Sequence, residues 1–90
     1  MLSIESMVRF TLTLPATTTP TTIEQQILPD LRSVNPSIIL VSFDHDEGIA
    51  SFDGPICSDA QYQSLGDLFN KWLEEEDSPI LTFAMTRGPA

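Results

Sequence analysis

The sequence predicts one small α+β domain, in the order strand, helix, strand, strand, helix, strand. Apolar residues alternate with period two in four short segments and recur every three or four residues in two longer ones, which are the periods of strands and of amphipathic helices. Proline, glycine and asparagine separate these segments. A chain of 90 residues, 41% of them hydrophobic, has room for one modest core and not for two.

Four strands are expected, over residues 7–14, 37–43, 49–53 and 80–86. The first has the clearest alternation, and its apolar side consists of Val8, Phe10, Leu12 and Leu14. A short run of turn-forming residues joins the second strand to the third, which predicts a hairpin. The single domain spans residues 1–90, and residues 1–6 and 87–90 are expected to be its flexible ends.

Two helices are expected between the strands. The first follows a Thr- and Pro-rich loop, with a capping box that begins at Thr21 or at Thr22. Pro29 interrupts its apolar stripe, so the helix must either kink there or restart with Pro29 in a first turn. The second helix begins with a capping box of Ser58 and Gln61 and carries a strong apolar stripe.

This order of elements resembles the ferredoxin-like fold, βαββαβ. In that fold two helices cover one face of a four-stranded antiparallel sheet with the strand order 4-1-3-2. The resemblance is one of pattern, spans nearly the whole chain and includes no motif. It implies a topology and does not imply a function.

That topology gathers eight of the thirteen acidic residues at one end of the molecule. They are Glu24, Asp44, Asp46, Glu47, Glu74, Glu75, Glu76 and Asp77. Arg9, Arg32 and Arg87 are expected at the opposite end. The formal net charge is −9, so we expect a chain whose charge is strongly lopsided and attracts basic partners.

The four acidic residues 74–77 are expected to destabilise the end of the helix that they close. A helix C-terminus carries partial negative charge, so carboxylates there are unfavourable. Function is one common cause of such a departure from local rules. Solubility is the other explanation, because exposed charges at a fraying helix end cost little.

No catalytic, cofactor or metal site is expected. His45 is the only histidine, and no serine or cysteine is placed by the sequence to act with it. Residues 44–48 lack the ligand ladder of a calcium loop. The first loop, residues 16–20, has neither the Cys-x-x-Cys of ferredoxin-like metal chaperones nor the arginine of acylphosphatases. The single cysteine, Cys57, excludes an internal disulfide and favours a cytoplasmic setting.

Neither a nucleic acid nor a membrane is expected as a direct partner. The four Lys and Arg residues are scattered, whereas phosphate binding needs clustered cations. The longest purely apolar run has only four residues, 38–41, and is far too short to cross a bilayer.

The second strand lies at an edge of the sheet in the 4-1-3-2 order. Ile39, Val41 and Phe43 share the side expected to face the core, which leaves Ile38 and Leu40 exposed on the other side. Exposed apolar rows on edge strands mark contact surfaces. A homodimer through Ile38 and Leu40 is therefore expected, unless residues 1–6 cover them.

These features favour a protein-binding module over an enzyme. We expect Asp44, Asp46, Glu47 and residues 74–77 to occupy a basic site on another protein, such as a nuclease or a nucleic-acid-binding complex, in place of a nucleic acid. In size, charge and lack of catalytic motifs the chain resembles small acidic phage inhibitors of host nucleases, including anti-CRISPR proteins.

Two alternatives stay open. One is a cofactor-free, dimeric ferredoxin-like enzyme or ligand binder, in which His45 or Tyr62 supplies acid–base chemistry. The other is a structural or assembly subunit that uses Ile38 and Leu40 as its contact surface.

Overall fold

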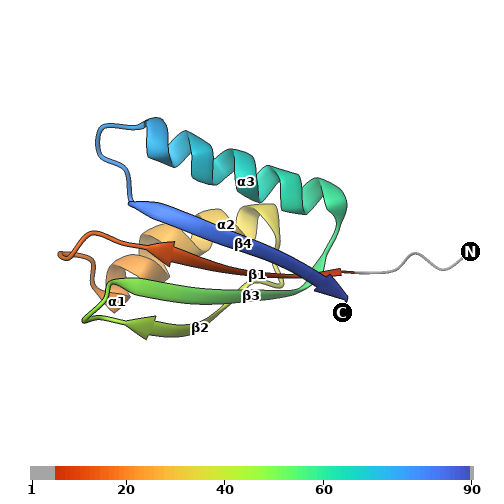
Figure 1. The fold of residues 1–90 in the computed structure, drawn as a ribbon, viewed down its shortest axis with the longest axis horizontal. Coiled ribbons are helices and arrows are strands. Elements are labelled where there is room, and N and C mark those ends of the chain that lie inside the picture. Colours follow the sequence, from red (N-terminus) through yellow and green to blue (C-terminus); the bar gives the residue numbers. More distant parts are fainter. Residues whose placement is uncertain (1–5, 90) are drawn as a thin grey trace, which may run out of the picture.

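Four antiparallel strands and two helical segments make up residues 6–89, which are the residues that the structure, a computed structural model, describes (Figure 1). The elements are β1 (Ser6–Thr13), α1 (Pro20–Thr22), η1 (Ile23–Ile27), α2 (Leu28–Val34), β2 (Ile39–Asp44), β3 (Ile49–Cys57), α3 (Asp59–Glu74) and β4 (Thr82–Pro89). The strand order is β2-β3-β1-β4. The predicted α+β class and strand order are confirmed, and the order is consistent with a ferredoxin-like layout.

β1 is the centre of the sheet because it pairs with both β3 and β4. Phe10 lies opposite Phe52 of β3 on one side and opposite Met85 of β4 on the other. The rings of Phe10 and Phe52 stack with their centroids 5.0 Å apart. The predicted alternation of β1 is confirmed, since Val8 and Phe10 are buried and Arg9 between them is exposed.

The helices bury their apolar residues on the Phe10 side of the sheet. One continuous core joins them to the strands, with helical members Ile23, Ile27, Leu28, Leu31, Leu65, Phe69 and Trp72. Phe69 of α3 lies at its centre, with ring centroids 5.3 Å from Phe10 and 5.0 Å from Phe83. The stripe that predicted the second helix is therefore its core-facing side.

The first helical segment begins earlier than predicted. Its N-cap is Thr19, and not Thr21 or Thr22, because the Thr19 hydroxyl accepts the Thr22 N–H at 3.2 Å and Pro20 occupies the first turn. A π-helical turn, η1, then leads into α2, which restarts with Pro29 in its first turn. A wider turn suits this position because proline has no N–H to donate.

The start of α3 is fixed by two separate contacts. The predicted capping box is confirmed: the Gln61 N–H donates to the Ser58 hydroxyl at 3.2 Å, and the Ser58 N–H donates to the Gln61 side chain at 2.9 Å. Arg87 of β4 also forms an ion pair with Asp59, and its guanidinium lies 5.3 Å from the ring centroid of Tyr62.

β4 extends further than predicted. Residues 87–89, expected to be part of a flexible end, continue the strand and pair with residues 6–8 of β1. The contacts of Arg87 with α3 hold this end of the strand in place. Residues 1–5 and Ala90, the rest of the predicted flexible ends, lie outside the described residues.

A β-bulge interrupts β2. Leu40 lies opposite Phe52, whereas Ser42, two residues further along, lies opposite the adjacent Ser51. Val41 is therefore an extra residue in β2. Side chains beyond a bulge no longer follow the alternation set before it.

The expectation that Ile38 and Leu40 are exposed is wrong, because Leu40 lies opposite buried Phe52 and so shares its core-facing side. Ile38 is fully buried and Leu40 packs half-buried against the core, whereas Ile39 and Val41 are 50% and 55% exposed. Phe43, beyond the bulge, also packs against the core. A count in steps of two had placed Ile39, Val41 and Phe43 together, and the bulge breaks that count.

A buried polar network fastens the α2–β2 connection to β3. Asn35 is 1% exposed, and its amide donates to the Ile56 carbonyl at 2.8 Å. Its side-chain oxygen accepts the N–H and the hydroxyl of Ser37 at 2.9 and 2.7 Å. Gly54 lies against this network, where a Cβ would stand 2.8 Å from Val8 and 3.4 Å from the Asn35 amide nitrogen. The Val8 side chain therefore leaves little room for a side chain at residue 54.

Gly54→Ala is expected to lower the free energy of unfolding by about 1–3 kcal/mol, because the buried side chains of Val8 and Ile38 must move to accept the methyl group. Gly66→Ala is the matched control. A Cβ there meets no atom within 4 Å, and alanine favours the helix, so stability is expected to rise by about 0.5–1 kcal/mol. Urea denaturation measures both changes. Equal effects at the two positions would contradict the packing around Gly54.

Candidate functional site

Three acidic segments lie at the same end of the molecule (Figure 1). The β2–β3 turn, the start of the first helical segment and the chain that follows α3 are all at the left of the view, and β4 ends at the right. All eight acidic side chains of these segments are exposed. We call them the acidic pole: Glu24, Asp44, Asp46, Glu47, Glu74, Glu75, Glu76 and Asp77. The structure thus brings the sequence-predicted partner-binding residues to one end.

Asp44 shapes the turn that carries its neighbours. Its carboxylate accepts the N–H groups of Asp46 and Glu47 at 3.0 and 3.2 Å, which is an Asx-type turn. Gly48 closes the turn with φ of +70°, a conformation that favours glycine, and its carbonyl accepts the Leu14 N–H at 2.7 Å. The turn is therefore held against the end of β1, with Asp46 and Glu47 exposed on it.

The end of α3 presents the longest acidic run. Trp72, 6% exposed, anchors the last turn in the core, and its carbonyl accepts the Glu75 N–H at 3.1 Å. Lys71 lies in the same turn and places one cation at the acidic pole, a position that the sequence prediction did not assign. Within the described part of the chain, no ion pair involves a carboxylate of the acidic pole.

Two arginines neutralise carboxylates that do not belong to the acidic pole. Arg9 pairs with Asp53 at 2.9 Å, and the hydrogen bond and charge of Asp53 raise the pKa of Arg9. Arg87 pairs with Asp59 at the start of α3, as described above. Arg32 lies in the last turn of α2, close to the start of β2. The negative charge of the acidic pole is thus left uncompensated by these three arginines.

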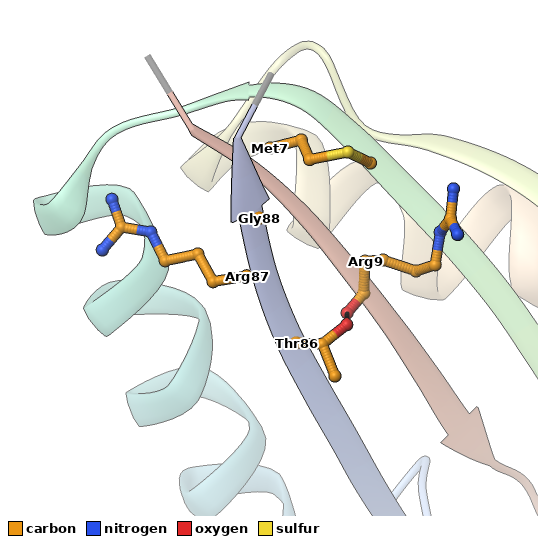
Figure 2. Close-up of a pocket in the computed structure, with 5 residues that line it drawn as sticks. All are labelled: Met7, Arg9, Thr86, Arg87 and Gly88. Atoms are coloured by element: carbon orange, nitrogen blue, oxygen red, sulfur yellow. Dashed lines mark hydrogen bonds between the residues drawn. The ribbon is translucent and has the colours of Figure 1, made fainter. Parts of the chain in front are cut away.

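A cavity of about 160 Å³ lies beside β1 and β4, lined by Met7, Arg9, Thr86, Arg87 and Gly88 (Figure 2). The Thr86 hydroxyl donates to the Arg9 carbonyl at 3.2 Å. Figure 2 shows the Arg9 side chain extending toward β3 and the Arg87 side chain extending toward α3. Because the two guanidinium groups diverge, this cavity does not offer a paired cationic site to an anion.

A second cavity, of about 240 Å³, lies within the acidic pole. It is lined by Thr13, Leu14, Ala16, His45, Asp46, Glu47, Gly48 and Leu81. His45 is exposed, with its ring edge-on to Phe43 at a centroid distance of 5.9 Å. Leu81, 59% exposed, was not assigned to a site by the sequence prediction. It lies just before β4, which begins at Thr82.

Other chemistry is not assembled in the part of the chain that is described. No group of three or more His, Cys, Asp or Glu residues among residues 6–89 is arranged to hold a metal ion. Cys57 is buried, and burial raises the pKa of its thiol, an effect that Asn35 and Arg87 oppose. No helix within these residues is both long and apolar enough to cross a membrane.

Comparison with protein-family models gives no match, and comparison with curated proteins also gives none. The interpretation of the acidic pole therefore rests on its geometry and charge.

Glu75→Gln with Glu76→Gln is expected to stabilise the protein, because these carboxylates lie at the negative end of the α3 dipole. The gain is expected to be about 1 kcal/mol or less at low ionic strength and to shrink as salt screens the repulsion. Thermal unfolding at low and high salt measures it. Asp30→Asn with Asp67→Asn removes the same charge from α2 and α3, outside the acidic pole, and is the control. An equal gain in both variants would mean that net charge, and not the position at the helix end, is responsible.

Proposed function

We propose that the protein is a small acidic protein-binding module on a ferredoxin-like frame, and that its acidic pole occupies a basic, nucleic-acid-binding site on another protein. One observation carries the proposal: eight exposed carboxylates share one end, and none of them forms an ion pair within the described residues. Lys71 is the one Lys or Arg that the described chain places in that end.

Electrostatics explains why such a surface selects such a partner. A protein that binds nucleic acid presents clustered Lys and Arg to the phosphates and releases counterions when they are neutralised. A dense group of carboxylates uses the same cations and is steered to them over the same long range. Because the carboxylates project together from one end of the fold, a basic site that they occupy would be closed to the nucleic acid. The proposed consequence is inhibition by nucleic-acid mimicry.

A nuclease is the first partner to test, because the chain resembles anti-CRISPR proteins of phages in size and charge. The alternative of a ligand-binding enzyme has one observation in its favour, which is that His45 lines a cavity with Asp46 and Glu47. That cavity, about 240 Å³, is below the 300–1,000 Å³ usual for ligand pockets. His45 is also exposed to water. We therefore place protein binding first.

The test uses the immobilised chain to capture proteins from a lysate at low salt, with and without duplex DNA as competitor. We expect nucleic-acid-binding proteins to be retained and to be displaced by the DNA. For a partner identified in this way, Glu75→Gln with Glu76→Gln is expected to weaken binding and to reduce the slope of log Kd against log salt, because two charges of the contact are removed.

Asp30→Asn with Asp67→Asn is again the matched control, since it leaves the acidic pole intact at the same net charge. It is expected to retain the slope of the wild type. Binding that duplex DNA does not compete away, or an equal loss in both variants, would contradict the proposed function.

A further inference from the structure

We propose that the outer edge of β2 pairs with the same edge of a second copy of this chain, antiparallel and about a two-fold axis. Among residues 6–89, β2 is an edge strand whose one partner is β3, and it forms the lower border of the sheet in Figure 1. Ile39 and Val41 are 50% and 55% exposed along it. The contact surface therefore differs from the predicted one, which consisted of Ile38 and Leu40.

The two edges of the sheet are protected to different degrees. Proteins commonly guard an edge strand with lysine, arginine, proline or a bulge. β4 contains Arg87 and ends at Pro89, and Arg87 ties it to α3. β2 has the sequence ILVSFD, without Lys, Arg or Pro, so its bulge is the only one of these devices it has, and that bulge leaves Val41 exposed. β2 is thus the edge on which pairing with another strand is least opposed.

The opposite charges at the two ends of β2 favour a second copy of this chain as the partner of its outer edge. Arg32 lies beside the start of the strand, where its Nε donates to the Ile38 carbonyl at 3.1 Å, and it forms no ion pair within the described residues. Asp44 ends the strand, and Asp46 follows in the turn. Antiparallel self-pairing sets the start of each β2 against the end of the other. Arg32 of each copy then approaches Asp44 and Asp46 of the other, and the symmetry makes this contact twice.

The same arrangement keeps the two acidic poles apart. β2 runs toward the acidic pole, so antiparallel pairing places the two poles at opposite ends of the dimer (Figure 1). A parallel pairing would set them side by side and add their repulsion. The contact with Arg32 uses only the β2 end of each pole, so this inference does not rest on the proposed function.

Sedimentation equilibrium over about 10 μM to 1 mM tests the inference, because a strand of six residues supports only a weak dimer. We expect the mass to rise with concentration from 9.9 kDa toward twice that value. Val41→Lys brings like charges together at the pairing edge and is expected to raise the dissociation constant at least about tenfold. Ile56→Lys adds the same charge at a residue that is also 55% exposed but lies off β2, and it should dimerise like the wild type.

Exchanging the charges of a contacting pair tests the antiparallel orientation. It also replaces the Val41→Lys test if circular dichroism shows that this variant does not fold. Arg32→Glu is expected to weaken dimerisation, and adding Asp46→Arg is expected to restore part of it. A wild type that stays monomeric throughout, leaving the edge to another protein or unpaired, would overturn the inference. Equal dimerisation of the Val41→Lys and Ile56→Lys variants would overturn it as well.

Discussion

The pairing of β1 with two antiparallel neighbours is the constraint on which the rest of the structure depends. Thr13 lies opposite Ile49 of β3 on one side and opposite Thr82 of β4 on the other. The Leu81 N–H donates to the Thr13 carbonyl at 2.6 Å, which brings the α3–β4 connection to the same place. The β2–β3 turn and the chain that follows α3 must therefore meet the end of β1 together. Two acidic segments that are about thirty residues apart in sequence become one charged end of the molecule.

Packing in the core keeps the fold stable despite the repulsion among the carboxylates at this end. Phe69 and Trp72 hold α3 to the sheet through contacts that do not involve its last residues. The carboxylates from Glu74 onward therefore weaken only the final turn, where charge is exposed and screened. At the opposite end, buried Asn35 joins the α2–β2 connection to β3 with its polar groups satisfied. A rigid frame with an uncompensated end is what electrostatic recognition of a basic partner requires.

Sequence periodicity was enough to predict the order of strands and helices along the chain, and cap residues predicted the capping box at Ser58, because alternation, breakers and caps are local signals. The strand order in the sheet followed from the resemblance of that element order to the ferredoxin-like fold. Periodicity failed where a local signal had two solutions. The second strand is apolar on both sides, so alternation could not fix its faces, and the bulge at Val41 decided them. Thr19 was passed over as a cap because several threonines near it were equally suitable. At the site, topology located the carboxylates, but Lys71 and Leu81 became part of that end only through the exact ends of α3 and β4.

The central claim is that the negative charge of the chain is concentrated at the acidic pole. The most direct measurement compares NMR relaxation of the backbone amides in the presence of a cationic and of a neutral soluble nitroxide. The cationic probe is expected to enhance relaxation, relative to the neutral one, most strongly at residues 44–48 and 74–77 and least at residues 35–37. A ratio that is uniform along the chain, or that is highest at residues 35–37, would contradict the account.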